Sequence, residues 1–151
     1  MSARDDHLLL RLRRFLPSED RDPLEDFLTE ALGWLLAHHD RLASALLARI
    51  GLPEVEVQQT TWTTQVRART GILDMVCATP ERVIVFEHKT YSSLHTDQLV
   101  RYRAWGDAQR DAACLVILIT PFVRGASARA DLHLTWSEVY ELLEGIDLAA
   151  P

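Results

Sequence analysis

The chain has 151 residues, 48% hydrophobic and 25% charged, which is the composition of an ordinary globular protein. Its formal net charge of −6 is not that of a protein that coats nucleic acid electrostatically. The apolar runs are too short to cross a bilayer, and no signal peptide is recognisable. We therefore expect one cytoplasmic domain over residues 1–151, with residues 1–22 as an N-terminal arm or short helix.

The distribution of charge and the positions of the two cysteines give weaker information about function. Between Arg67 and Arg110, seven basic residues stand against five acidic ones, so the acidic excess lies toward the ends. This distribution is compatible with a phosphate-bearing substrate but does not argue for one. Cys77 and Cys114 both lie in apolar segments without a Cys or His at zinc spacing, which favours two buried thiols.

Two helices are predicted in the first third of the chain. Apolar residues recur at helical spacing from residue 24 to 36, after Asp22 as the expected N-cap and with Glu25 three residues later, as in a capping box. A second helical stretch covers about residues 40–50 and ends at Gly51.

The rest of the chain predicts strands interrupted by one helix and closed by another. We expect strands over residues 55–64, 65–78 and 82–89, a helix over 96–110, strands over 113–120 and 132–135, and a helix over 136–143. The continuous apolar run in the third strand indicates burial on both faces. The predicted fold is α/β, a mixed sheet with helices on both faces, in the order αβββαβ followed by a strand and a helix.

Two carboxylates and one ammonium are predicted to meet on adjacent strands. Glu87 and Lys89 are two residues apart on a strand, so they share a side. A hairpin across residues 79–81 would bring Asp74 close to Glu87. Two carboxylates suit Mg²⁺, and an ammonium beside them can orient a water or stabilise developing negative charge.

Lys89 is the only lysine in the chain, whereas the other fifteen basic residues are arginine. A compact ammonium differs from a guanidinium where a point charge is required, so this favours a specific role. The alternatives are that Asp74 and Glu87 lie at a solvated sheet end, or that they form a structural ion pair with Lys89, which is common in proteins.

The spacing of Asp74 from the sequence Glu87-His88-Lys89 resembles that of the PD-(D/E)XK nuclease superfamily, which has a restriction-endonuclease-like core. The resemblance spans roughly residues 23–143, and Leu73 stands where the name-giving proline would be. It implies that Asp74, Glu87 and the carbonyl of His88 bind Mg²⁺, with Mn²⁺ expected to replace it. It also implies that Lys89 serves the attacking water.

Further residues on the two flanking helices fit the same resemblance. Glu30 lies on an otherwise apolar helix side, and the family often carries a glutamate on its first helix that reaches the metal site, usually through water. Gln98 and Tyr102 are i and i+4 on a helix and resemble the Gln-X-X-X-Tyr element of the exonuclease-like branch. The alternatives are an ordinary boundary glutamate, a solvated glutamine and a partly buried tyrosine.

Several aromatic and basic residues have two possible roles. The tryptophans could stack on bases, although core packing is the more common role. The arginines of the central part of the chain are candidate phosphate contacts, although each alone is more often a surface charge. These residues are Trp62, Trp105, Trp136, Arg67, Arg69, Arg101 and Arg103.

The leading hypothesis is a Mg²⁺-dependent nuclease that hydrolyses DNA, or with less support RNA, through a metal-activated water. The main alternative is a non-catalytic nucleic-acid-binding or assembly module on the same fold. A homodimer or a partner subunit is expected, because a domain of this size has little surface for recognition. A small-phosphate-ester enzyme is a weaker alternative, since no Gly-rich phosphate loop is present. Endo- and exonuclease activity are both left open.

Overall fold

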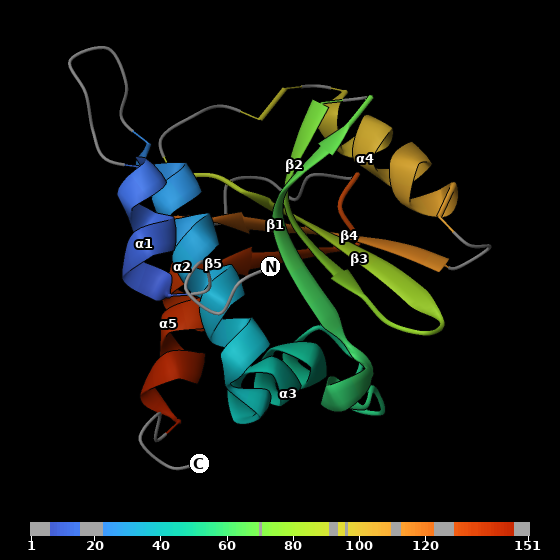
Figure 1. Cartoon of the computed structure of the whole chain (residues 1–151). Coiled ribbons are helices and arrows are strands. Elements are labelled where there is room, and N and C mark those ends of the chain that lie inside the picture. Colours follow the sequence, from blue (N-terminus) through green and yellow to red (C-terminus); the bar gives the residue numbers. More distant parts are fainter. Residues whose placement is uncertain are drawn as a thin grey trace.

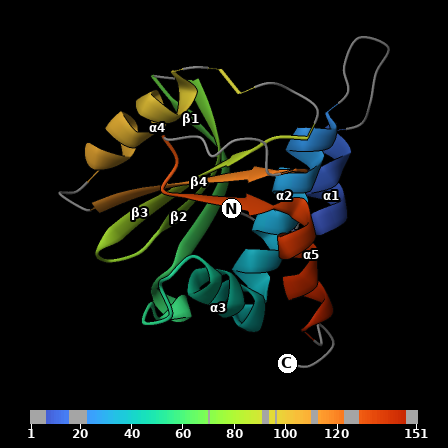
Figure 2. The same ribbon diagram turned by 180° about the vertical axis from the view of Figure 1, so that it is seen from behind.

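The computed structural model describes residues 7–15, 23–69, 71–90, 94–95, 97–109, 113–122 and 129–146. These residues form a five-stranded mixed sheet with helices on both faces (Figures 1 and 2). The predicted α/β class is therefore confirmed. The expected N-cap, Asp22, lies outside the described residues.

The sheet has the strand order β1-β2-β3-β4-β5. The first three strands form two antiparallel hairpins, whereas β4 runs parallel to β3 and β5 runs parallel to β4. The strands are β1 (Thr61–Ala68), β2 (Gly71–Ala78), β3 (Arg82–His88), β4 (Ala113–Thr120) and β5 (Leu132–Thr135).

Helices cover the two faces unequally (Figure 1). The larger core lies under α2, α3 and α5, where Leu36, Leu46 and Val139 pack on Phe86 and Ile119 of the sheet. α1 and a short 3-10 helix, η1, precede α2. The helices of this side are α1 (Leu8–Leu12), η1 (Arg13–Phe15), α2 (Leu24–His38), α3 (Asp40–Arg49) and α5 (Trp136–Glu144).

The smaller core lies under α4 (Gln98–Asp107) on the opposite face of the sheet. Leu99 and Tyr102 of this helix pack against Leu73, Val85 and Val116. Because α4 joins β3 to the parallel strand β4, the helix begins near the C-terminal end of β3, where Glu87 lies. Among the described residues, no helix has the length and apolar character needed to span a membrane.

The structure corrects the predicted boundary between the first two strands. Residues 55–60 are not a strand, and residues 57–59 form a 3-10 helix, η2 (Val57–Gln59). β1 instead continues through Gln65 to Ala68, and the hairpin turn comes just before Gly71. Gly71 has a φ of 130°, a conformation that glycine adopts at no steric cost, which explains why the turn lies there.

Candidate active site

The candidate site lies where β2 and β3 separate. The two strands pair as far as Met75 and Phe86, and the next two opposed residues, Asp74 and Glu87, are no longer a ladder pair. The half-buried Asp74 instead accepts a hydrogen bond at Oδ2 from the backbone N–H of His88, at 2.7 Å. Because the strands separate, the Asp74 carboxylate accepts the hydrogen bond that a backbone carbonyl of β2 would accept in a continued ladder.

Glu87 and Lys89 project from the same side of β3, as their spacing predicts. The Lys89 ammonium forms ion pairs with Glu87 and with Glu25 of α2, the latter at 3.2 Å. The backbone N–H of Thr90 donates to the other Glu25 oxygen, at 3.0 Å. The first turn of α2 therefore holds both the lysine and the chain that follows it.

α4 adds two side chains to this cluster from successive turns. Gln98 donates from Nε2 to Glu87 Oε1 at 2.7 Å, and the same nitrogen lies 2.8 Å from the hydroxyl of Tyr102. Tyr102 donates from that hydroxyl to the carbonyl of Ile72 on β2, at 2.7 Å. The predicted i, i+4 pair thus lies on one helix face and connects Glu87 to both α4 and β2.

His88 faces the other side of the sheet and is fully buried. Its Nδ1 lies 2.6 Å from Thr29 Oγ1 of α2, and its ring packs edge-on against Trp136, with ring centroids 5.2 Å apart. Trp136 also donates from Nε1 to the carbonyl of Lys89, at 2.9 Å. Burial, with a smaller effect of the Lys89 charge, lowers the pKa of His88 to about 3, so this histidine is neutral.

Glu30 makes no direct hydrogen bond or ion pair with Asp74, Glu87 or Lys89 among the described residues, so its part in binding the metal stays a prediction. Its Oε1 is paired with Arg11 Nε of α1 at 2.5 Å, and its Oε2 accepts from Thr64 Oγ1 of β1 at 2.5 Å. Both oxygens therefore have partners among the described residues. These partners compensate the cost of burying the carboxylate, and the ion pair connects α1 to α2.

The glutamate that α2 does contribute is Glu25, which was not predicted as a site residue. Its position three residues after Asp22 is also that of a capping-box glutamate, and this simpler role masks the other. In the structure its carboxylate contacts Lys89 and Thr90. The available signal was indirect: a lone lysine on a buried strand requires carboxylates around it.

The electrostatics of the cluster follow from burial. Burial raises the pKa of the Asp74 carboxyl to about 8, with a further rise from Glu87, although the His88 hydrogen bond opposes it. Burial likewise raises the pKa of Glu87 against the effect of Lys89. For Lys89, burial favours the neutral amine, but the surrounding carboxylates outweigh it and raise the pKa. Near neutral pH, a charged lysine therefore stands beside Glu87 and an Asp74 carboxyl that still holds most of its proton.

The donor set of this cluster fits a divalent cation that prefers oxygen. Glu87 Oε2 is buried and accepts no hydrogen bond from an N–H, an alcohol hydroxyl or an ammonium of the described residues, so its neighbouring donor is the Asp74 carboxyl when that carboxyl is protonated. A cation at Asp74 and Glu87 would replace the proton on Asp74 and would be bound by both carboxylates. In the described part of the chain, no three His, Cys, Asp or Glu side chains form a metal-binding group, so waters and backbone carbonyls would complete the shell.

The structure shows the surroundings of the tryptophans and arginines for which two roles were possible. The three tryptophans pack against the cores, so core packing is confirmed for Trp62, Trp105 and Trp136. Arg103 pairs with Asp131 at 2.6 Å and donates to a backbone carbonyl, which makes it structural. Three arginines are exposed and form no ion pair with any described residue: Arg67, Arg69 and Arg101.

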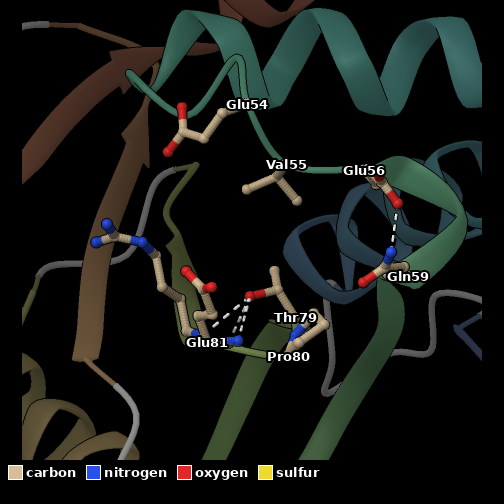
Figure 3. A pocket seen from close by; sticks show the side chains of 8 residues that line it. Glu54, Val55, Glu56, Gln59, Thr79, Pro80 and Glu81 are labelled. Carbon is tan, nitrogen blue, oxygen red and sulfur yellow. Dashed lines mark hydrogen bonds between the residues drawn. The ribbon is translucent and has the colours of Figure 1, made fainter.

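A separate cavity of about 260 Å³ lies beside the turn between β2 and β3 (Figure 3). This turn is at the opposite end of β3 from Glu87. The lining includes Glu54, Glu56 and Glu81, so its charge does not suit a phosphate. Thr79 Oγ1 accepts hydrogen bonds from the backbone of the turn, as the figure shows, and its role there is structural.

Comparisons with known proteins give little likeness. No protein-family model matches the chain, and no curated protein matches it. A solved structure that matches is the MspJI restriction endonuclease in complex with a 27-mer oligonucleotide, at 12% sequence identity and a TM-score of 0.34. The match covers 95% of this chain and 34% of the other, so this chain spans about a third of that protein. Similarity of this size supports no function, so the proposed function depends on the geometry of the cluster.

Proposed function

We propose that the chain is a Mg²⁺-dependent nuclease that hydrolyses phosphodiester bonds, with DNA favoured over RNA as the substrate. The observation that carries the proposal is the pair of buried carboxyls, Asp74 and Glu87, beside the Lys89 ammonium, in which Glu87 Oε2 accepts no hydrogen bond from an N–H, an alcohol hydroxyl or an ammonium of the described residues. Two buried carboxyls that have only each other at this point are suited to a bound cation.

Each residue of the cluster has a distinct part in this proposal. Asp74 and Glu87 would hold the cation, which when bound polarises the phosphodiester and makes a coordinated water more acidic. Lys89 stabilises negative charge that develops on the phosphate, and Glu25 keeps its ammonium in place. Gln98 fixes the orientation of the Glu87 carboxylate, since it donates to Oε1 and not to Oε2.

The unpaired arginines support a nucleic-acid substrate beside this cluster. Arg67 pairs in the ladder with Ile72, whose carbonyl accepts from Tyr102, and Arg101 is the residue before Tyr102. The end of the β1–β2 hairpin and the start of α4 therefore lie together, as Figure 1 shows. Guanidinium groups with no acidic partner are suited to phosphates of a polyanionic backbone.

A cleavage assay tests the proposal. Wild type, Lys89→Ala and the control Arg41→Ala would be incubated with linear and circular, single- and double-stranded DNA and RNA in Mg²⁺, Mn²⁺ or EDTA. Arg41 is an exposed arginine of α3, away from the cluster. We expect cleavage by wild type and Arg41→Ala, none in EDTA, and a loss of about 10²–10⁴-fold in Lys89→Ala, the range for a group that acts on the reacting atoms.

Two results would contradict the proposal. If folded wild type cleaves none of these substrates, the non-catalytic module becomes the better account, and retained binding of DNA would identify it. If neither Lys89→Ala nor Lys89→Met folds, the lysine is a structural ion-pair partner. Circular dichroism of each variant distinguishes lost folding from lost activity.

A further inference from the structure

The backbone of β1 has an unusual conformation beside the cluster. Among the non-glycine residues that the structure describes, Gln65 alone has a positive φ, at 51°. A side chain with a Cβ seldom adopts this left-handed conformation, and it is most unusual within a strand. Such outliers occur where the surrounding structure requires them, often beside functional sites.

Gln65 stands opposite Asp74 in the β1–β2 hairpin. The ladder pairs Thr64 with Met75 and Val66 with Leu73, and it skips the position between them. The register is the same on both sides of the gap, so no residue is inserted and this is not a β-bulge. The irregularity is therefore a change of backbone direction at one residue.

Both strands exchange faces at this position. In β1, Trp62 packs in the core under α2 and α3, whereas Val66 packs in the core under α4. In β2, Met75 lies in the first core and Leu73 in the second. Residues separated by an even number of positions in a regular strand share a face, so the alternation is reversed between them.

The reversed side-chain alternation coincides with an unusual hydrogen bond of Asp74. In a regular ladder, a backbone carbonyl of β2 would accept from the N–H of His88. Here the Asp74 carboxylate accepts it instead, at 2.7 Å, and β2 leaves β3 at this point. We propose that Gln65 is a positioning residue, whose left-handed backbone takes Asp74 out of the ladder and directs its carboxylate to β3. That the position of Asp74 serves catalysis rests on the proposed function, whereas the geometry of Gln65 and Asp74 is independent of it.

Paired substitutions separate the backbone of Gln65 from its side chain. Gln65→Gly and Gln65→Val both remove the hydrogen bond from Gln65 Nε2 to Asp26 Oδ1, which measures 3.3 Å. Glycine keeps the left-handed conformation freely, whereas β-branched valine strongly disfavours it. Thr63→Val is the matched control, because Thr63 is exposed on the same strand and has no positive φ.

The first measurement is the amide resonance of His88 in a ¹H–¹⁵N spectrum, with Asp74→Asn as the reference for a lost carboxylate bond. We expect Gln65→Val to move this resonance toward its Asp74→Asn position, and Gln65→Gly and Thr63→Val to leave it unchanged. Mg²⁺ titrated into the same samples should bind about 10–100-fold more weakly to Gln65→Val, the range for loss of a group that orients a ligand. If Gln65→Val fails to fold, Gln65→Ala takes its place, with a smaller shift in the same direction.

Two results would overturn the inference. One is a wild-type His88 resonance and wild-type Mg²⁺ affinity in Gln65→Val. The other is a change in Gln65→Gly as large as that in Gln65→Val, which would assign the effect to the lost Asp26 hydrogen bond. A wild-type protein that binds no Mg²⁺ and cleaves nothing would contradict the proposed function, while the His88 resonance would still decide the role of Gln65.

Discussion

At the scale of single residues, the candidate site combines groups that are costly to bury. Glu87, His88 and Lys89 are consecutive, and each is 8% exposed or less. Their side chains alternate between the two faces, so Glu87 and Lys89 contact the α4 side and the first turn of α2, whereas His88 contacts Thr29. A strand that held only apolar residues here would be simpler to stabilise, so the cost indicates a function.

Thr29 offers a direct test of how firmly His88 is held. Its hydroxyl is the one hydrogen-bond partner of the His88 ring among the described residues, because Nε2 has none. Thr29→Val removes that partner with little change in shape and should lower the free energy of unfolding by about 1–3 kcal/mol. Urea unfolding measures it, with exposed Thr63→Val as the control. Equal stability of the two variants would show that the hydrogen bond contributes nothing.

The Asp74–Glu87 pair predicts a pH dependence of stability in the metal-free protein. The carboxyl of Asp74 loses its proton near 3.8 in the unfolded chain but near 8 in the folded one. The folded state thus binds more protons between these values, and the free energy of unfolding falls as pH rises through this window. His88 acts in the opposite direction, but only below its ordinary value of 6.5.

The range from pH 6.5 to 8.5 therefore isolates the carboxyl pair. We expect the thermal midpoint of wild type in EDTA to fall across this range and that of Asp74→Asn to stay nearly constant. Mg²⁺ should remove most of the fall in wild type, because the cation replaces the proton on Asp74. Parallel curves for the two proteins in EDTA would contradict a raised pKa at Asp74.

At the scale of elements, the site depends on how closely α2 approaches the sheet. Gly33 of α2 faces Thr64 of β1, and a Cβ at Gly33 would collide with Thr64 Cγ2. The first turn of the same helix carries Glu25, which pairs with Lys89. The glycine is required by the contact and not by its backbone conformation.

A pair of substitutions tests this contact. Gly33→Ala should destabilise the protein, since overpacking costs about 1–3 kcal/mol and the better helix propensity of alanine offsets only about 1 kcal/mol. In a Thr64→Ser background the methyl group is absent, and the same substitution should become neutral or stabilising. Thermal unfolding of wild type, the two single variants and the double variant gives the coupling free energy between Gly33 and Thr64. Additive effects would mean that the helix does not approach β1 at this point.

Periodicity predicts most of these elements because it depends on local pattern. The apolar run of residues 113–120 and the helix after residue 135 are found where expected. The first strand boundary was misplaced because Gln65 reverses the side-chain alternation from which strands are recognised. The residue type of Gln65 does not predict its positive φ, and the contact between Glu25 and Lys89, which are 64 positions apart, cannot be predicted from local pattern.

At the scale of the whole molecule, the net charge of −6 must be reconciled with a polyanionic substrate. The acidic cavity near Glu54 and Glu81 lies at the opposite end of β3 from Lys89, whereas Arg67 and Arg101 lie near Tyr102. The charge is thus distributed so that one end of the sheet is less repulsive to phosphate than the other. The expected homodimer or partner subunit stays a prediction, which sedimentation equilibrium would test.

Salt dependence tests this distribution. Binding of a labelled duplex by Glu87→Gln, chosen to prevent cleavage, should weaken as salt rises, and each of Arg67→Gln and Arg101→Gln should reduce the salt slope by about 1. Arg41→Gln, at an exposed arginine away from the site, should leave it unchanged. An equal effect of all three substitutions would indicate attraction by net charge alone.

The most direct test of the central claim is the rate of DNA cleavage as a function of Mg²⁺ concentration, for wild type and Glu87→Gln. We predict a saturable rate in wild type and a loss of about 10²-fold or more in Glu87→Gln, because its amide cannot replace the buried carboxylate oxygen. Both proteins should fold, since Gln98 can still bond to the remaining side-chain oxygen. Cleavage at the wild-type rate by Glu87→Gln, or cleavage independent of Mg²⁺, would contradict the assignment of this cluster as the active site.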